Sequence, residues 1–589
     1  MKIRFKLATE LFVQAGCYWG IVGFGEHAQQ MPITDWTAEI TEQETYHTHK
    51  GDLITLHGVI RVSQRPEIPF TCTAEELYEP RGILKVVAKN AGALARCVRD
   101  GFADAIRDAV QEASNPTQIE SWPTIGYIKD GVYLAGDYVI TDGEFRDAEP
   151  LGIRHRPYES DPAVQRLCLR RRDDTECRDL LGHVLHEFAF VVDQRITLPI
   201  LGHIFAAPHM SNRAMASKYG LCTLWVHGDS GTGKSELGRF AQCFYGDYPS
   251  QESLLSTSST PNFLALAGHM FRDAVVTYDN VSRGNLPGNA WKSFEQIIQD
   301  AYSRTARGRL TGDIDIRQPF PVRGLPVVTA EEPPTSPAVV GRSLVLAMGD
   351  PQKNPEKYHA CLDRCRDYSA VMAHYIAFVQ RNYTPEDLRR KADAYQFENF
   401  GGGVSDNADR LTQNAAVNRL GFCLLIEFAS SRDVIDAADA ELLLGHHEVV
   451  LMELMQATRQ ASIEEKPGEK FVALLSEAIS SGAAHIHRGL NPENGELDAV
   501  GFAPSSDRIA IFPGAAYALV TRGVDFSHTR NVVGAQLKRE GFLLRFDVDR
   551  TTTSFNYAGK DHRVWLFSAD TFGFGHRVTE DNVGFDDEF

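Results

Sequence analysis

A glycine-rich stretch near the middle of the chain, GDSGTGKS, fits the pattern G-x-x-x-x-G-K-[ST] at every defined position. Glycines let the backbone take conformations closed to other residues, so that successive N–H groups converge on a phosphate group. The lysine ammonium neutralises phosphate oxygens, and the serine hydroxyl is a ligand for Mg²⁺. The pattern predicts a site for ATP and Mg²⁺ formed by Gly228, Asp229, Ser230, Gly231, Thr232, Gly233, Lys234 and Ser235.

The segments on either side of this loop favour a phosphate site over a glycine-rich structural turn. Residues 221–227, LCTLWVH, have the pattern of a short apolar strand, and residues 236–246, ELGRFAQCFYG, that of a helix with one apolar side. A helix that begins at the loop directs its positive end at the phosphates. We therefore expect a strand, a loop and a helix in the order typical of a P-loop.

A second apolar run, DAVVTYDN at residues 273–280, ends in an aspartate. Asp279 lies where a P-loop protein needs an acidic residue, at the end of a neighbouring strand, to hold the Mg²⁺ shell. The next residue is Asn280, which can position a water molecule but cannot accept its proton. We therefore expect either slow hydrolysis or a base supplied from elsewhere, such as Glu331 or Glu332.

A third apolar run, LPVVTAEE, is followed by prolines that force the chain out of a strand. Its polar end predicts a sensor of the γ-phosphate at Thr329, Glu331 or Glu332. Arg342 lies just before another apolar run, and suits a cation that reaches the nucleotide of a neighbouring subunit. A surface salt bridge explains Arg342 equally well at this point.

Between the second and third strands, a helical pattern leads into a turn rich in glycine and aspartate, after which we expect a hairpin. Arg304, Arg307 and Arg309 lie in this insertion. In a ring of subunits, the three cations would reach a central channel and hold the phosphates of single-stranded DNA. A solvated, salt-bridged face is the alternative interpretation.

The composition restricts the contacts that the chain can make. It has 60 Lys and Arg against 78 Asp and Glu among 589 residues, a formal net charge of −18, so any DNA contact must be local. Ten cysteines without a CxxC pair predict a reduced, cytoplasmic protein. No window reaches the roughly 18 uninterrupted apolar residues of a membrane span, so we expect no membrane partner.

The C-terminal part has a strand and helix pattern in DRIAIFPGAAYALVTR, a second helix that ends at Gly541, and two later strands. This order resembles a winged helix, in which the last two strands form the wing. Many winged helices bind only proteins, whereas others bind DNA through a basic side. That side would consist of Arg530, Lys538, Arg539, Arg545, Arg550 and Lys560.

The length predicts about three to five domains. Short strands dominate the beginning of the chain, and helical patterns lie on both sides of the P-loop segment. We therefore expect a multidomain α/β protein with a parallel-sheet core. The predicted parts are an α+β accessory domain at 1–155, a helical collar at 156–215, the P-loop ATPase core at 216–350, a helical domain at 351–465 and a winged-helix-like domain at 466–589.

Taken together, the P-loop, the strand ending in Asp279, the arginine-bearing insertion, the TAEEPP sequence and Arg342 resemble the superfamily 3 helicases. These are AAA+-type ATPases of phages, plasmids and integrative elements, and the likeness is to their primase-helicase-like members. The resemblance covers residues 200–350 and implies a RecA/AAA+-like core. It also implies a trans-acting arginine finger at Arg342.

The resemblance further implies that Ser235 and Asp279 hold Mg²⁺ and that the γ-phosphate sensor lies near Thr329. Members of the family usually show an acidic pair at the second motif and an asparagine at the sensor strand. This chain has Asp279 followed by Asn280, and Thr-Ala-Glu at the sensor. The departures concern motor activity more than ATP binding.

Three functions fit these patterns. The leading one is a hexameric, ATP-dependent DNA helicase or translocase that replicates a phage, plasmid or integrative element. The alternative is a nucleotide-gated regulatory or anti-phage defence ATPase that assembles with partners without unwinding DNA, which Asn280 and the net acidity favour. A small-molecule kinase is the third, but the sequence shows no second substrate pocket.

Overall fold

The computed structural model describes most of the chain. The described residues are 11–23, 25–48, 50–158, 162–282, 284, 286, 289–306, 309–310, 316–317, 320–334, 336–349, 354–395, 406–464, 467–490, 499–522, 528–547 and 549–573. Within these ranges, no helix is long and apolar enough to cross a membrane.

The chain divides into two compact units, Met1–Met455 and Gln456–Phe589. The boundary falls inside a helix, α16 (Ala437–Glu464), whereas the sequence places it after residue 465. The division of the first unit into four smaller domains stays a prediction.

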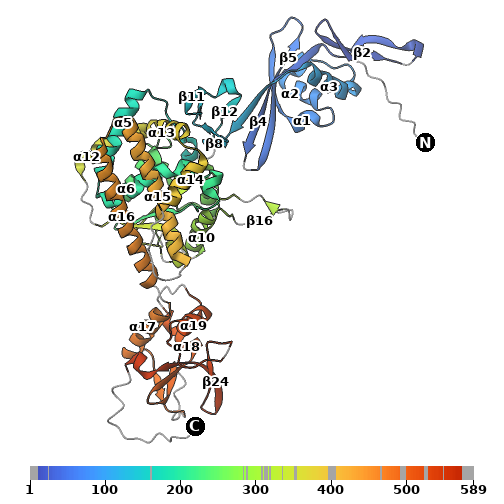
Figure 1. The fold of residues 1–589 in the computed structure, drawn as a ribbon. Helices are drawn as coiled ribbons and strands as arrows, with labels where there is room; N and C mark the ends of the chain where they lie inside the picture. Colours follow the sequence, from blue (N-terminus) through green and yellow to red (C-terminus); the bar gives the residue numbers. More distant parts are fainter. Residues whose placement is uncertain are drawn as a thin grey trace. The chain divides into compact units, whose positions relative to one another are not determined.

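The first unit begins with a three-stranded antiparallel sheet and a larger sheet of order β12-β7-β4-β5-β6 (Figure 1). Alternate residues of the long strands β4 and β5 are buried, because successive side chains of a strand point to opposite faces. Helices α2 (Gly82–Ala91) and α3 (Ala103–Ala113) share a core with these strands around Trp36 and Ile60. The strands are β1 (Leu11–Gln14), β2 (Cys17–Val22), β3 (Gln29–Pro32), β4 (Trp36–Thr48), β5 (Gly51–Val62), β6 (Ile68–Thr73), β7 (Thr117–Trp122) and β12 (Ile153–His155).

A four-stranded antiparallel meander follows, and its strands are neighbours in chain order. The KDG and AGD sequences supply its first two turns, with positive φ at Gly131 and Gly136. Its strands are β8 (Gly126–Lys129), β9 (Val132–Leu134), β10 (Tyr138–Thr141) and β11 (Glu144–Asp147).

The centre of the first unit is a five-stranded parallel sheet of order β14-β15-β18-β13-β19. β13 and β18 consist almost wholly of buried residues, as expected for parallel strands that are covered on both faces. The strands are β13 (Thr223–His227), β14 (Leu255–Ser256), β15 (Val275–Val281), β18 (Leu325–Ala330) and β19 (Ser343–Ala347). The helices that connect them are α8 (Lys234–Cys243), α9 (Pro261–Met270), α10 (Asn289–Ser303) and α11 (Pro337–Val340).

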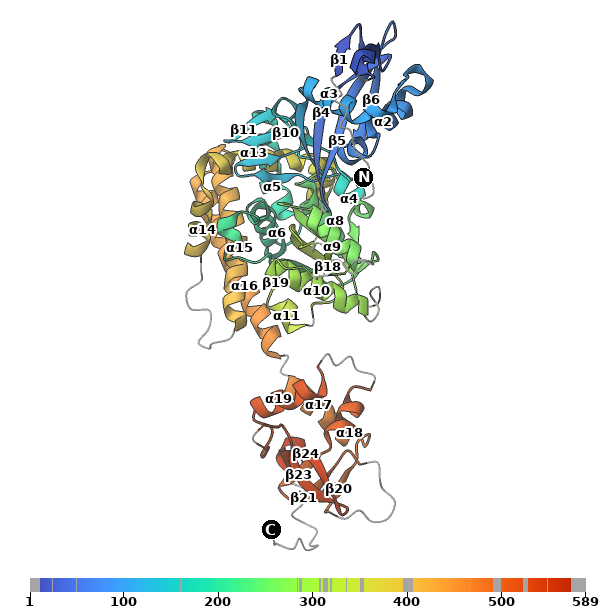
Figure 2. The same ribbon diagram turned by 90° about the vertical axis from the view of Figure 1, so that its right-hand side faces the viewer.

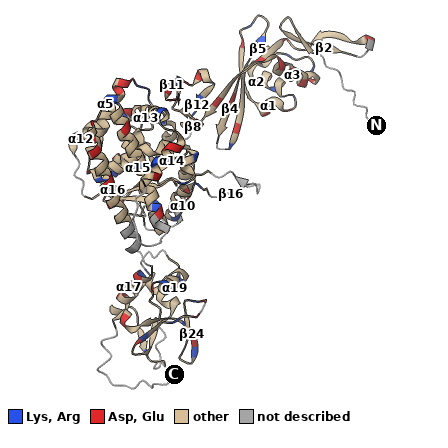
Figure 3. Cartoon of the chain, viewed as in Figure 1, with Lys and Arg blue, Asp and Glu red and all other residues tan. Residues whose placement is uncertain are grey.

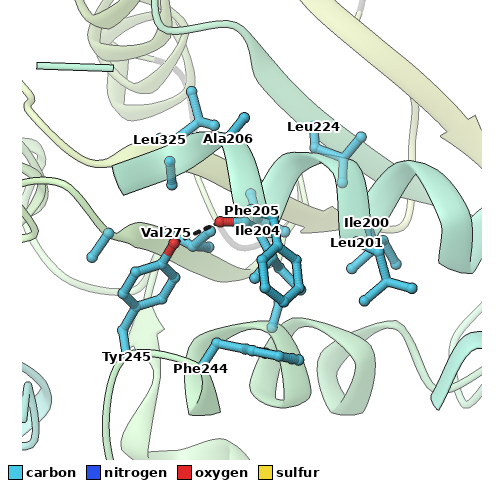
Figure 4. Packing of buried hydrophobic residues seen from close by; sticks show 14 of the residues in the cluster. Ile200, Leu201, Ile204, Phe205, Ala206, Leu224, Phe244, Tyr245, Val275 and Leu325 are labelled. Atoms are coloured by element: carbon cyan, nitrogen blue, oxygen red, sulfur yellow. Dashed lines mark hydrogen bonds between the residues drawn. The ribbon is translucent and has the colours of Figure 1, made fainter. Parts of the chain in front are cut away.

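Helix α6 (Gln194–Ala206) belongs to the core of this unit, and every residue from Ile196 to Ala206 is buried. Phe205 packs edge to face against Phe244, with ring centroids 5.5 Å apart (Figure 4). The Tyr245 hydroxyl donates to the Ile204 carbonyl oxygen at 2.6 Å, which satisfies a polar group inside the apolar cluster. The segment expected to form a collar therefore packs directly against the P-loop core.

The first unit contains further helices. α15 runs beside α6 in both views (Figures 1 and 2), and Asn418 of α15 donates to the Pro199 carbonyl oxygen of α6 at 2.7 Å. The helices are α5 (Asp174–His186), α12 (Pro355–Arg364), α13 (Tyr368–Asn382), α14 (Pro385–Ala394), α15 (Asp406–Ser431) and the first part of α16.

We expect the variant Gly421→Ala to destabilise the first unit. A Cβ atom at Gly421 would lie 2.0 Å from the Gly202 carbonyl oxygen and 2.5 Å from the Ala206 nitrogen, so α6 and α15 would have to separate. Overpacking of this kind costs about 1–3 kcal/mol of unfolding free energy. The measurement is urea unfolding followed by tryptophan fluorescence.

The matched control is Gly445→Ala on the exposed side of α16, where a Cβ atom meets no atom within 4 Å among the described residues. Alanine is a better helix former than glycine by about 1 kcal/mol, so this variant should be as stable as the parent chain or more so. Equal midpoints for the two variants would show that the α6–α15 contact tolerates a side chain.

Among its described residues, the second unit combines the end of α16 and three further helices with a five-stranded sheet of order β20-β21-β22-β24-β23. β23 and β24 form an antiparallel hairpin, and Trp565 of β24 packs edge to face on Phe471 of α17. The elements are α17 (Pro467–Ser480), β20 (Ile486–Arg488), β21 (Gly501–Ser505), β22 (Arg508–Ile511), α18 (Pro513–Val520), α19 (Arg530–Arg539), β23 (Thr553–Tyr557) and β24 (Lys560–Ser568).

Candidate nucleotide site

The predicted phosphate loop joins the carboxyl end of β13 to the start of α8. Gly228, Gly231 and Gly233 have φ values of +152°, +80° and +98°, a region that side chains disfavour. Gly228 also passes so close to β19 that a Cβ atom would lie 2.0 Å from the Met348 carbonyl oxygen. The glycines are therefore required by the backbone path, and this path suits a loop whose N–H groups surround an anion.

The Lys234 side chain folds back over this loop. Its Nζ donates to the carbonyl oxygens of Gly228 at 2.8 Å and Asp229 at 2.6 Å, and to Thr232 Oγ1 at 3.2 Å. Burial lowers the pKa of Lys234, while the carboxylates of Glu331, Asp229 and Asp279 act in the opposite direction. A partly desolvated ammonium group thus lies inside the glycine loop, where the sequence predicts phosphate oxygens.

Asp279 meets Thr329 at the carboxyl edge of the sheet, because β18 lies between the P-loop strand β13 and the Asp279 strand β15. Thr329 Oγ1 donates to Asp279 Oδ1 at 2.5 Å and accepts a bond from the Asn280 N–H at 3.2 Å. The Thr329 side chain is buried, and its strand neighbour on the other side is Val226. Thr329 therefore connects the aspartate to the strand that enters the P-loop.

Asn280 occupies a backbone conformation that asparagine tolerates better than most residues. Its φ is +58°, and the pairing of β15 with β18 shifts register between Tyr278 and Val281. Thr257, at the end of β14, donates to the Asn280 carbonyl oxygen at 2.9 Å and lies 3.2 Å from the Asp279 carbonyl oxygen. The bulge exposes the Asn280 side chain, while Asp279 is half-buried.

We expect Thr329→Val to weaken both Mg²⁺-dependent nucleotide binding and stability. The change keeps the shape of the side chain but leaves the Asn280 N–H without its acceptor and Asp279 without its donor, which costs about 0.5–1.5 kcal/mol for each hydrogen bond lost. The measurement is the Mg²⁺ concentration that half-saturates ATP hydrolysis, together with the thermal midpoint. Thr329→Ser, which retains the hydroxyl, is the control, and equal effects of the two changes would contradict this role.

The two glutamates of the third strand differ in their surroundings. Glu331 carries the carboxylate with the largest influence on the pKa of Lys234, and its N–H donates to the Val281 carbonyl oxygen at 3.3 Å. Glu332 uses its carbonyl oxygen to accept from Trp225 Nε1 at 3.0 Å. Of the two glutamates, Glu331 is therefore the one whose carboxylate influences the Lys234 ammonium in the loop.

Arg342 lies at the amino ends of the parallel strands, whereas the phosphate loop lies at their carboxyl ends. It directly precedes β19, whose first residue pairs with Thr223 at the start of β13, and a five-residue strand spans about 15 Å. Its Nη1 donates to the Ala338 carbonyl oxygen at 2.7 Å, and its guanidinium lies 5.6 Å from the centre of the Tyr302 ring. Arg342 is not part of the site in its own chain, and its role toward a neighbouring copy stays a prediction.

Arg304 is half-buried, and backbone carbonyl oxygens hold its guanidinium, so its contact with DNA stays a prediction. Its Nη2 donates to the carbonyl oxygens of Met210 at 2.5 Å and Tyr219 at 3.2 Å. Burial lowers the pKa of Arg304 to about 10. Its guanidinium ties the end of α10 to the segment that precedes β13.

The expected hairpin follows α10. β16 (Arg309–Leu310) pairs antiparallel with β17 (Ile316–Arg317). Arg307 and the side chain of Arg309 lie outside the described residues. Their contact with DNA stays a prediction.

Two residues that support the site carry no motif signal. Gly238 of α8 lets the helix approach the sheet, since a Cβ atom there would lie 2.8 Å from Thr277 Cγ2 and 3.1 Å from Thr329 Cγ2. Gln242, one turn later, donates to the Val275 carbonyl oxygen at 2.8 Å and accepts from the Thr277 N–H at 3.0 Å. These contacts fix α8 against the strand that carries Asp279, and they depend on residues distant in sequence.

In the second unit, most of the predicted basic residues are exposed on or after α19. Lys538 is the exception, because its ammonium lies 4.0 Å from the centre of the Phe546 ring and 3.4 Å from the Arg550 carbonyl oxygen. The exposed members are Arg530, Arg539, Arg545, Arg550 and Lys560.

The fold and this site define a multidomain α/β protein whose parallel sheet carries a phosphate loop. The residues fit ATP and Mg²⁺, because the loop glycines, Lys234, Ser235 and Asp279 supply the N–H groups, cation and oxygen ligands that these groups need. When bound, Mg²⁺ would neutralise charge on the phosphate oxygens.

No protein-family model and no curated protein matches the chain by sequence. Its fold is similar to a solved structure titled "SCCmec type IV Cch - active helicase". The likeness covers 97% of this chain and 100% of that chain, with a TM-score of 0.56 and 10% sequence identity. At this identity the likeness shows a shared fold over nearly the whole chain and nothing about activity.

Proposed function

We propose that the chain is an ATP-dependent DNA helicase or translocase that acts as a hexamer. It would function in the replication of a phage, plasmid or integrative element. The single observation that carries this proposal is the distribution of groups on the parallel sheet. The phosphate loop, Thr329 and Asp279 lie at the carboxyl ends of the parallel strands, while Arg342 lies at their amino ends. An arginine so placed is too far from the phosphate loop of its own chain, and we propose that it acts on the nucleotide of another copy.

Within one chain, the proposed roles follow from position. Lys234 holds phosphate oxygens, and Ser235 and Asp279 are the Mg²⁺ ligands. Thr329 keeps the Asp279 carboxylate in place through its 2.5 Å hydrogen bond. Asn280 would orient the water, or Glu331 or Glu332 would deprotonate it. Of the two glutamates, Glu331 is the one whose charge influences the pKa of Lys234.

Assembly is supported by the state of Arg342. Its Nε is buried, and among the described residues no group accepts a hydrogen bond from that atom. Burial together with the cation of Arg410 lowers the pKa of Arg342. The charge of a guanidinium that lies against an aromatic ring and near a second cation is stabilised when a phosphate binds to it. We propose that a neighbouring subunit supplies that phosphate as part of its bound ATP.

Contact with DNA is proposed for the β16–β17 hairpin, with Arg307 and Arg309, and for the second unit, as a winged helix. The order of α18, α19, β23 and β24 supports a winged helix, with the β23–β24 hairpin as its wing. The similarity of the fold to a solved structure titled as an active helicase also supports a contact with DNA. A cytoplasmic location agrees with this function.

A nucleotide-gated regulatory or defence ATPase is the second candidate. The observation that favours it is Asn280, an amide at the position where hydrolytic P-loop proteins of this type place a carboxylate. Such a protein would bind ATP, assemble and contact a partner without moving along DNA.

The test compares ATP hydrolysis with and without single-stranded DNA, for the parent chain and for the double variant Arg307→Ala, Arg309→Ala. A translocase should be stimulated by DNA, and the double variant should lose the stimulation, with its DNA-free rate as the internal reference. Absence of stimulation and of strand separation in the parent chain, combined with ATP-dependent assembly, would establish the second candidate instead.

A further inference from the structure

A groove of about 640 Å³ lies in the first unit, away from the nucleotide site. It is formed by the loop before α5, the C-terminal end of α13, the end of α15 and Phe145 of the meander. Figure 3 shows charged residues of both signs beside α5 and α13. Four arginines line the groove: Arg171, Arg172, Arg381 and Arg432.

Cations exceed anions in this groove, although the whole chain carries a net charge of −18. The carboxylates in its lining are Asp173 and Asp174. Asp173 is the N-cap of α5 and accepts from the Glu176 N–H at 2.9 Å, so the helix end already satisfies it. Asp174 is 73% exposed and pairs with Arg432. Carboxylates outside the lining also compete for the arginines, because Asp147 pairs with Arg171 and Asp367 pairs with Arg172.

The arginines keep spare donors. A guanidinium has five N–H donors, yet Arg171 bonds only Asp147, at 2.9 Å, and Arg432 bonds only Asp174, at 2.8 Å, among the described residues. Arg381 donates to the Gly143 carbonyl oxygen, which fixes the side chain at the groove. The donor geometry of such held guanidinium groups matches phosphate.

Aromatic rings lie beside these cations. Phe145 and Phe378 line the groove, and His374 packs 4.9 Å from the Phe145 ring. Burial lowers the pKa of His374, and its Nε2 lies 2.9 Å from the Arg172 carbonyl oxygen. Arginines that bind phosphate next to rings that can stack on a base are the combination by which proteins hold single strands.

We propose that this groove binds the phosphates of a single-stranded nucleic acid, as a contact separate from the hairpin and from the second unit. The inference deepens the proposed function and rests on it for the identity of the strand. The chemistry recognised is the phosphate group, so a free phosphate compound is the other source that the test must separate.

The experiment measures binding of the full-length chain to a fluorescently labelled oligothymidylate by anisotropy over a salt series. The variants are Arg171→Glu, which removes a groove cation, and Asp174→Asn, which removes a competing carboxylate. Arg146→Glu is the matched control, because Arg146 follows the groove residue Phe145 on β11 but pairs with Glu144 outside the groove. Pyrophosphate binding is measured in parallel by calorimetry in a Lys234→Ala background.

We expect Arg171→Glu to weaken oligothymidylate binding about tenfold and to lower the salt slope by about 0.7 to 1. Asp174→Asn should tighten binding, and Arg146→Glu should leave it unchanged. Changes confined to pyrophosphate would assign the groove to a free phosphate compound. Unchanged affinities for both probes in Arg171→Glu and Asp174→Asn would overturn the proposal, whereas absence of DNA-stimulated hydrolysis with altered binding would overturn only the motor function.

Discussion

Replacing Lys234 by alanine is expected to reduce ATP hydrolysis by about 10²- to 10³-fold, as found when a preorganised charge-stabilising donor is removed. Lys234 is the one cation in the phosphate loop, and the loop holds it in place through the carbonyl oxygens of Gly228 and Asp229. Alanine leaves the glycine path intact, so the loss should fall on nucleotide affinity and turnover and spare the fold. The measurement is phosphate release at saturating Mg²⁺.

The control for this variant is Lys292→Ala, which removes an exposed ammonium group from α10 in the same unit. It should hydrolyse ATP at the parental rate. A Lys234→Ala chain that retained parental hydrolysis, with an unchanged thermal midpoint, would rule out the P-loop as the nucleotide site.

Asp279→Asn is expected to reduce hydrolysis by a similar factor, about 10²- to 10³-fold, while nucleotide binding without Mg²⁺ is retained. Asparagine preserves the size of the side chain and can accept the Thr329 hydroxyl, so the change removes the negative charge and leaves the hydrogen bond. The measurement pairs Mg²⁺-dependent turnover with the affinity for a fluorescent ATP analogue in EDTA. The two assays separate loss of the metal ligand from loss of the loop.

Asp363→Asn makes the same chemical change at an exposed position of α12 and serves as the reference. If Asp279→Asn turned over ATP at the rate of this reference, the magnesium ligand would have to lie elsewhere. Glu331→Gln would then be the next variant, because the Glu331 carboxylate also acts on the pKa of Lys234.

The sequence predicts those parts of the site that depend on short segments. A strand, a glycine loop and a helix occur in one continuous stretch, so their order and chemistry can be recognised without long-range information. The strand that carries Asp279 is also recognisable from its apolar run, although β15 continues to Val281, and the hairpin after α10 is marked by its turn residues.

Features that depend on distant contacts could not be predicted in this way. Arg304 resembles the other arginines of its insertion in type and spacing, yet Met210 and Tyr219 bind its guanidinium from a segment before the P-loop. The left-handed backbone at Asn280 depends on Thr257 and on a register shift between two strands. Such contacts are set by the tertiary fold, which one sequence alone does not specify position by position.

Strand β19 has a consequence for any assembly that this chain forms. Its first residue follows Arg342, and the residue after its end, Met348, lies against Gly228 and donates its N–H to the His227 carbonyl oxygen at 2.7 Å. One short strand therefore joins the edge that would meet a neighbour's nucleotide to the loop that would hold the chain's own. In the proposed assembly, this backbone would link the occupancy of one subunit's nucleotide site to the shape of the next subunit's phosphate loop.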